Sequence, residues 1–315
     1  MERMEKVERD SVYLYDFACH EDERPLCELE LGLLLNGEPG ERFMLSDRLV
    51  DPSRSPFLRG RLTVEKRGGS LEEASEAASE LALNGETFKL RYIEADGEAD
   101  YDERRRIERT VGANIRGKAE MKRPQRLYGI ARSGEEWLLG PYTESEPVWL
   151  RHNEKPRQYS TALGTRTARA VANIAVPVPE GIKAVDPCCG IGTVLIEAKS
   201  MGIDMDGFDL NPLAAIGARE NLAHFGLPGT VVVADMRTLE GHYDALVLDL
   251  PYNLCSVLTA EERLEMLRAA RRLAKRCVIV ATEEIGPQVE AAGFRLAEHC
   301  IVRKGRFARH IRVGV

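Results

Sequence analysis

The run from Val185 to Ala198 constrains the fold more than any other part of this sequence, because it is typical of a strand, a glycine turn and a helix start. Gly190 and Gly192 stand at the turn, where glycine permits tight backbone angles and lets a ligand approach the main chain. From Thr165 onward, short apolar strands alternate regularly with helical segments. Such alternation predicts an α/β domain with a parallel sheet, helices on both faces, and ligands bound at the carboxyl ends of the strands.

The second half of the chain divides into a series of expected elements. Strands are predicted at about 184–186, 205–209, 230–234, 245–249, 277–281, 294–303 and 307–313, and helices at 168–176, 192–201, 212–225, 260–275 and 285–292. The last two strands follow each other too closely for a crossover helix, so one of them must pair antiparallel. The sequence therefore predicts a domain over residues 166–315 with seven mostly parallel strands.

The first half has a different character, with shorter strands and turn signals between them. Strands are predicted at 11–18, 58–65, 88–93, 127–132 and 136–140, with helices at 23–35, 70–83 and 101–113. Ser70 and Glu73 form a capping-box pattern at the start of the second helix. We therefore expect an α+β module over residues 1–147, and the proline-containing, aperiodic stretch 148–165 is predicted to be a linker. Two domains also fit the length of 315 residues.

The composition is that of a soluble globular chain, with 43% hydrophobic and 30% charged residues and no apolar run long enough to cross a membrane. The N-terminus is charged and lacks an apolar signal core, so a cytoplasmic location without membrane association is expected. The seven cysteines are scattered without a C-x-x-C pair, which indicates reduced thiols. The six histidines are also scattered, so no metal site is expected.

The net charge of −7 argues mildly against a nucleic-acid partner, but its distribution is uneven. Between Arg104 and Arg126 there are nine Lys and Arg residues and only two Glu. Such a local stripe can bind phosphates even on an acidic protein, although each charge taken alone could simply be solvated. The predicted contacts are Arg104, Arg105, Arg109, Arg116, Lys118, Lys122 and Arg123.

Three aspartates follow successive predicted strands of the second half. Asp186 precedes the glycine turn in the pattern D-x-x-x-G-x-G, Asp209 ends the next strand, and Asp235 follows the third. Each taken alone could be a turn or cap residue. Together with Gly190, Gly192 and the free N–H groups of the helix that begins near Thr193, they predict a nucleotide cofactor site. Asp209 can accept from ribose hydroxyls and Asp235 from an adenine amine.

This loop is not the G-x-G-x-x-G pattern of nicotinamide enzymes, because Leu195 stands at the third glycine position. It resembles instead the nucleotide loop of S-adenosylmethionine-dependent methyltransferases. The cofactor expected from this resemblance is S-adenosyl-L-methionine.

The run Asp249-Leu250-Pro251-Tyr252 resembles the D/N-P-P-Y motif of methyltransferases that act on exocyclic amines of bases. An aromatic amine is a poor nucleophile, and acceptors for its protons favour the tetrahedral nitrogen of the transition state. The Asp249 carboxylate and the Leu250 carbonyl would supply these acceptors. Pro251 would fix the turn, and Tyr252 would stack on a flipped-out base. Leu250 departs from the usual first proline.

The two motifs and the N-terminal half together resemble the THUMP-containing tRNA guanosine-N2 methyltransferases. The resemblance also rests on Phe88–Arg91, Ile107–Ala113, Lys122–Gln125 and Trp137–Gly140, and on the run Arg151–Ala175 before the second domain. It implies a Rossmann-like class I methyltransferase with a seven-stranded sheet, preceded by a ferredoxin-like and THUMP-type RNA-binding domain.

The implied activity is methyl transfer from S-adenosyl-L-methionine to N2 of a tRNA guanosine, without a metal. Adenine-N6 methylation of RNA or DNA is a second possibility, because the D-x-P-Y loop serves any exocyclic amine. A non-catalytic RNA-binding protein with this fold is a third, for which Leu250 is the hint. The target nucleotide, mono- or dimethylation and the oligomeric state stay open at this point.

Overall fold

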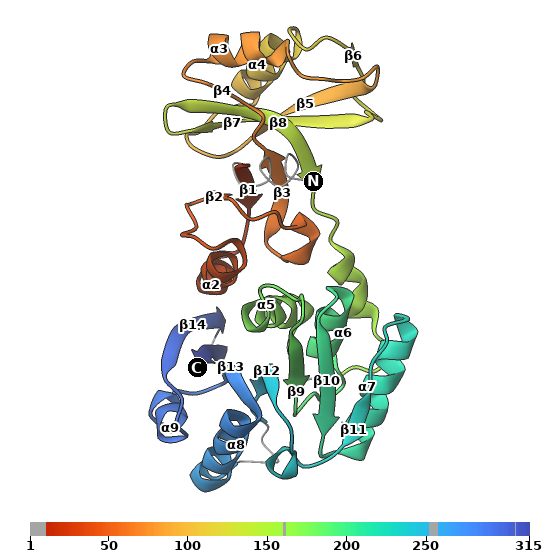
Figure 1. Ribbon diagram of the computed structural model, residues 1–315, viewed down its shortest axis with the longest axis vertical. Coiled ribbons are helices and arrows are strands. Elements are labelled where there is room, and N and C mark those ends of the chain that lie inside the picture. Colours follow the sequence, from red (N-terminus) through yellow and green to blue (C-terminus); the bar gives the residue numbers. More distant parts are fainter. Residues whose placement is uncertain (1–10, 160–161, 252–257, 306) are drawn as a thin grey trace. The chain divides into compact units, whose positions relative to one another are not determined.

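The computed structural model describes residues 11–159, 162–251, 258–305 and 307–315, which form two compact units (Figure 1). The first unit comprises the chain up to residue 18 together with 35–146, and the second comprises 19–34 and 147–315. Each unit has its own sheet. In the described part of the chain, no helix is both long and apolar enough to cross a bilayer.

The first unit is built on an eight-stranded sheet in the order β2-β1-β3-β8-β7-β5-β6, with β4 paired to β8. Two helices, α3 (Leu71–Ala78) and α4 (Tyr101–Gly112), bury their apolar sides against β5, β7 and β8. The strands are β1 (Tyr13–Phe17), β2 (Phe43–Ser46), β3 (Leu58–Thr63), β4 (Lys66–Gly68), β5 (Thr87–Ile93), β6 (Lys118–Ala119), β7 (Arg126–Ser133) and β8 (Glu136–Glu144). A 3-10 turn, η2 (Pro52–Arg54), precedes β3.

The start of α3 follows the predicted cap only in part. The Ser70 hydroxyl accepts from the N–H of Glu73 at 3.1 Å, as expected, but the Glu73 carboxylate accepts from the N–H of Gly69 at 2.8 Å. The helix ends at Ala78, five residues before the predicted end at Leu83. Ser79 there donates its hydroxyl to the Glu76 carbonyl at 2.7 Å, and this local bond accompanies the loss of helical geometry.

The second unit has the predicted seven-stranded sheet, in the order β11-β10-β9-β12-β13-β15-β14. The pairs from β11 to β13 are parallel, and β15 pairs antiparallel with both β13 and β14, as the short connection required. The strands are β9 (Lys183–Asp186), β10 (Asp204–Asp209), β11 (Val231–Val233), β12 (Tyr243–Asp249), β13 (Ala274–Ala281), β14 (Leu296–Lys304) and β15 (Phe307–Gly314). This is the predicted Rossmann-like α/β arrangement.

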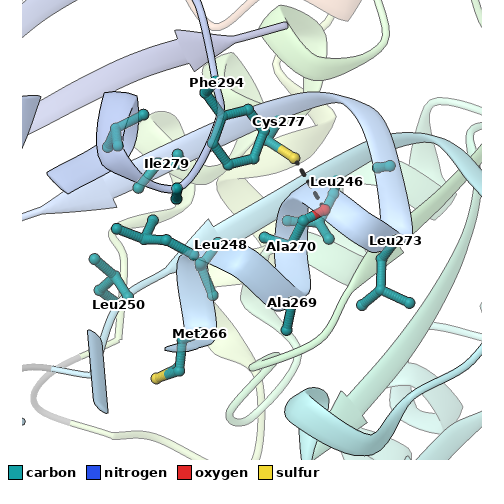
Figure 2. Packing of buried hydrophobic residues seen from close by; sticks show 14 of the residues in the cluster. Leu246, Leu248, Leu250, Met266, Ala269, Ala270, Leu273, Cys277, Ile279 and Phe294 are labelled. Atoms are coloured by element: carbon teal, nitrogen blue, oxygen red, sulfur yellow. Dashed lines mark hydrogen bonds between the residues drawn. The ribbon is translucent and has the colours of Figure 1, made fainter. Parts of the chain in front are cut away.

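Helices cover both faces of this sheet. On one face, α8 (Ala260–Leu273) and α9 (Gly286–Ala291) enclose a core that includes Leu246, Leu248 and Ile279 (Figure 2). On the other face, the guanidinium of Arg276 in β13 donates to the Ile174 carbonyl of α5 (Thr165–Ala175). The remaining elements of this unit are α6 (Thr193–Ser200), α7 (Pro212–His224), η1 (Glu21–Glu23), η3 (Val148–Glu154) and η4 (Met236–Thr238).

The buried core shown in Figure 2 fixes the position of β12 along its own axis, and so the point in the sheet at which this strand ends. Leu246 and Leu248 are fully buried, and the Cys277 thiol donates to the Ala270 carbonyl at 3.6 Å. Burying one leucine side chain contributes about 1.5–3 kcal/mol, so sliding this strand along the sheet would be costly. The core therefore sets Asp249 at the carboxyl edge of the sheet.

Helix α2 (Arg24–Leu35), apart from its last residue, belongs to the second unit, although residues 23–35 were predicted as part of the module over 1–147. Its Glu30 side chain is fully buried and accepts from the Asn173 amide of α5 at 2.6 Å. A buried carboxylate requires such a partner, and the partner lies 143 residues further along the chain. No local pattern could have indicated this long-range pair.

Candidate active site

A cavity of about 420 Å³ opens at the carboxyl ends of β9, β10 and β12. This volume is within the usual range for a small-molecule site. Its walls come from the turn after β9, the ends of the neighbouring strands, the segment before α5 and the first turns of α8. The predicted residues that line it are Asp186, Gly190, Thr193, Asp209, Asp235, Asp249, Leu250 and Pro251.

The glycine turn has the strained geometry that its sequence predicted. Gly190 has φ +54° and Gly192 has φ +80°, both in the left-handed region that favours glycine. A Cβ atom added at Gly190 would meet no atom within 4 Å, so the backbone here is open to an approaching ligand. Gly192 has a packing role instead, because a Cβ there would lie 3.1 Å from Cβ of Ala218 in α7.

Asp209 ties this turn to the next strand. One carboxylate oxygen accepts from the N–H of Gly190 at 2.8 Å, and the other accepts from the N–H of Asn211 at 2.8 Å. Asp235 lies beyond the end of β11, caps η4 through the N–H of Arg237 at 2.9 Å, and forms an ion pair with its guanidinium at 2.7 Å. The hydrogen bond from the Arg237 side chain lowers the pKa of Asp235. Both aspartates therefore accept hydrogen bonds from nearby backbone N–H groups, as turn or cap residues do, and both also line the cavity.

Asp186 is buried at the floor of the cavity and accepts from the N–H of Cys188 at 3.2 Å. Burial raises the pKa of Asp186 well above its usual range. Two polar atoms of the cavity wall, Oγ1 of Thr193 and Oδ1 of Asp249, are buried and have no hydrogen-bond partner among the described residues. Buried polar atoms normally have partners, so these two atoms are candidate ligand contacts.

Asp249 ends β12 and faces the cavity. Burial raises the pKa of this carboxyl to about 7, although the positive charge of Arg309 acts to lower it. A group with a pKa near neutrality that is also an orphaned acceptor in a cavity is typical of an active site.

The structure explains why leucine replaces the first proline of the usual motif. The N–H of Leu250 donates to the Val280 carbonyl at 3.0 Å, a bond that proline cannot make. Its side chain is 4% exposed and packs with Leu248 and Met266 (Figure 2). The turn is thus held by a ladder bond and by burial. Pro251 lines the cavity, and Tyr252 lies outside the described residues.

The predicted RNA-binding residues all lie in the first unit, on α4 and on the segment from its end to β7. Arg104 is half-buried and paired with Glu94, and Arg105 pairs with Glu108 at 2.8 Å. The remaining five predicted residues are all exposed and are not placed in these two ion pairs: Arg109, Arg116, Lys118, Lys122 and Arg123. They therefore form the accessible part of the stripe.

One polar cluster near the cavity was not predicted. Glu197 of α6 is fully buried, with one carboxylate oxygen 2.6 Å from Nδ1 of His152 and the other 2.7 Å from Nη1 of Arg169. The signal in the sequence is a glutamate within the apolar run Thr193–Ala198. Nothing local identifies its partners, which come from η3 and α5.

A second cluster brings together histidines that are scattered in sequence. Side-chain ligand atoms of Glu284, His299 and His310 lie within 4.8 Å of one another, a spacing that a metal ion could bridge. The buried guanidinium of Arg312, however, pairs with Glu284 and lies 3.3 Å from Nδ1 of His310. It occupies the lone pairs that an ion would need and places a fixed positive charge beside them.

Comparisons with known proteins find similarity to methyltransferases. Residues 152–285 match the family described as RMKL-like, methyltransferase domain. A tRNA (guanine(10)-N2)-dimethyltransferase of Methanothermobacter thermautotrophicus is 30% identical over 208 residues, covering 62% of this chain and 60% of that protein. The mouse U6 snRNA (guanine-N(2))-methyltransferase THUMPD2 is 31% identical over 112 residues, covering 33% of this chain and 21% of that protein.

Among solved structures, TrmN from Thermus thermophilus has a TM-score of 0.51 and 21% sequence identity, covering 96% of this chain and 99% of that chain. This similarity concerns the fold. The chain spans 60% of the length of the Methanothermobacter relative and 49% of that of a Pyrococcus abyssi enzyme of the same name. Residues 152–285 match a methyltransferase domain, and guanine-N2 methyltransferases of tRNA and of U6 snRNA are among the proteins to which this chain is similar.

Proposed function

We propose that this protein is an S-adenosylmethionine-dependent RNA methyltransferase that methylates N2 of a guanosine in tRNA. The observation that carries the proposal is the cavity in which the glycine turn, Asp209 and the orphaned Asp249 carboxylate meet. The named activity of the curated relatives, on tRNA and on U6 snRNA, supports the same substrate class.

The residues of the cavity fit this cofactor. The open backbone at Gly190 and the hydroxyl of Thr193, at the start of α6, suit its carboxylate end, because helix N-termini favour anions. Asp209 and Asp235 line the same cavity and would accept hydrogen bonds from the ribose hydroxyls and the adenine amine. When bound, the cofactor supplies an electrophilic methyl group on a positively charged sulfur.

The chain's own contribution to the reaction is positioning. Oδ1 of Asp249 would accept a hydrogen bond from the guanosine amine and orient its nitrogen for in-line attack. This bond strengthens as the nitrogen becomes tetrahedral and positive, so it stabilises the transition state more than the bound substrate. Pro251 lines the same cavity and shapes the turn around the amine.

The reaction should depend on pH through Asp249. Only the ionised carboxylate is a full acceptor, and burial raises its pKa to about 7. We expect kcat/KM to fall about tenfold per pH unit below pH 7 and to reach a plateau above it. Single-turnover rates measured from pH 5.5 to 9 would check this, and a flat profile would contradict it.

The exposed stripe should contribute affinity without sequence preference. Replacing Lys122 and Arg123 by glutamine should reduce the slope of log K against log salt by about 0.7–0.9 for each lost phosphate contact. The matched control replaces Lys275 and Arg295, two exposed cations of the second unit, by glutamine. Equal slopes for the two double variants, in filter-binding or anisotropy titrations, would refute the role of the stripe.

The test of the function is a mass-spectrometric analysis of nucleosides. Unmodified tRNA incubated with the protein and labelled S-adenosylmethionine should yield labelled N2-methylguanosine or its dimethyl form, and mapping should place it at one position. Labelled N6-methyladenosine would favour the adenine alternative. RNA binding without any label transfer would favour the non-catalytic alternative.

A further inference from the structure

The β14–β15 hairpin extends past the edge of the sheet at which the cavity opens. Strand β13 ends at Ala281, which is paired with His310 of β15. Earlier residues of β15 pair only with β14, with Arg309 opposite Val302 and Phe307 opposite Lys304. Because β15 runs antiparallel to β13, Phe307 and Arg309 lie beyond the carboxyl ends of the parallel strands. They are therefore on the same edge as the cavity.

Strand register also assigns these residues to the face of the sheet that carries Asp249. Asp249 is in register with Val280, and Val280 is in register with Ile311. Registered neighbours share a face, and so do residues two apart along a strand. Arg309 and Phe307 precede Ile311 by two and four residues and thus lie on the Asp249 face. Arg303, paired with Ala308, lies on the opposite face.

The separation of Asp249 from Arg309 suits an inserted base. The strands β12 and β15 are two positions apart in the sheet, a lateral spacing of about 9.6 Å, and Arg309 lies two residues, about 7 Å, further along β15 than the position in register with Asp249. The guanidinium of Arg309 lies 4.7 Å from the ring centroid of Phe307, whose side chain is 40% exposed. This stacking orients the guanidinium, and its positive charge lowers the pKa of Asp249.

We propose that Arg309 is a specificity-determining residue that binds the O6 and N7 atoms of the target guanine while Asp249 accepts from its N2 amine. The inference rests on the proposed function and names a second contact of the same site. Guanine presents donors at N2 and acceptors at O6 and N7, so a carboxylate facing a guanidinium complements it, and arginine to O6 and N7 is a common base contact. An adenine with its N6 amine at Asp249 has no exocyclic oxygen for Arg309.

The test combines protein variants with an altered base. Arg309→Gln should reduce kcat/KM for the natural RNA about 10- to 100-fold. For RNA with 2-aminopurine at the mapped target, which keeps the amine but lacks O6, Arg309→Gln should cost much less. Arg303→Gln, which removes an exposed cation from the opposite face of the same hairpin, should match the unchanged protein. An equal loss on both RNAs, or none on either, would overturn the assignment.

A titration that does not require activity separates this inference from the proposed function. The ¹³C carboxyl signal of Asp249 should titrate at higher pH in Arg309→Gln than in the unchanged protein, because the opposing charge is gone. The other titratable groups that line the cavity with Asp249, among the described residues, stay in both proteins; they are Tyr159, Asp186, Cys188, Cys189, Asp209, Asp235, Arg237 and Glu262. An unmoved titration refutes the coupling. If the unchanged protein methylates no RNA, the proposed function fails, and the base contact fails with it.

Discussion

Replacing Asp249 by alanine should reduce methyl transfer to RNA by about 10²–10³-fold, the usual cost of removing one preorganised group that stabilises a developing charge. Oδ1 of this carboxylate is buried in the cavity wall and has no hydrogen-bond partner among the described residues. Single-turnover measurements at saturating cofactor would isolate the chemical step. A variant with near-normal turnover would remove Asp249 from the mechanism.

The affinity for S-adenosylmethionine should change little in the same variant, because the glycine turn, Asp209 and Thr193 remain. Asp244→Asn is the matched control, since Asp244 is an exposed carboxylate at the other end of the same strand. Calorimetric titration of both variants with the cofactor would separate binding from chemistry. Loss of cofactor affinity in Asp249→Ala alone would assign this carboxylate to cofactor binding instead.

The stability of the isosteric variant Asp249→Asn should move in the opposite direction to its activity. Because the folded-state pKa of about 7 exceeds the unfolded value, ionisation of Asp249 costs stability as pH rises from about 4 to 7. Asparagine avoids this cost, so at pH 8 the variant should be more stable by up to about 4 kcal/mol, at about 1.4 kcal/mol for each unit by which the pKa is raised. Equal melting temperatures at pH 8 would show that the carboxyl titrates normally.

The sequence predicted the second unit well because its pattern is local. Strands β9, β11 and β12 are short, mainly apolar runs, and α-helices follow β9, β10 and β12; that alternation predicts a parallel sheet. The first unit was harder. Strands β2, β4 and β6 were missed, since each spans only two to four residues and lacks a readable alternation. Their pairing depends on distant strands rather than on their own residues.

The same contrast applies to the site. Asp186, Asp209 and Asp249 could be predicted because each ends a strand, and strand ends meet at one edge of a parallel sheet. Arg309 could not be placed near Asp249, because its position depends on the register of β15 against β13. The burial of Leu250 likewise follows from the packing of α8, which no motif encodes. Tertiary register, rather than residue type, separates the two groups.

Replacing Arg169 by methionine should destabilise the second unit by about 3–5 kcal/mol, because it leaves the buried Glu197 carboxylate without its guanidinium partner. Arg169 is 2% exposed and also donates to the Ser200 hydroxyl at 3.0 Å. For a domain of this size, each kcal/mol shifts the melting temperature by about 2–4 °C, so a decrease of about 10 °C is expected by calorimetry.

The control and the rescue follow from the same contacts. Arg166→Met on the same helix removes a surface pair with Glu23 at 3.2 Å, which should cost less than about 1 kcal/mol. In Arg169→Met/Glu197→Gln the buried charge is gone and the amide can still bond to His152, so much of the stability should return. Equal losses in the single and double variants would show that packing of the arginine stem, rather than its charge, stabilises this region. Glu197 joins η3 and α5 to α6, the helix that begins at the glycine turn. Any loss of cofactor affinity in these variants should therefore be proportional to the loss of folded protein.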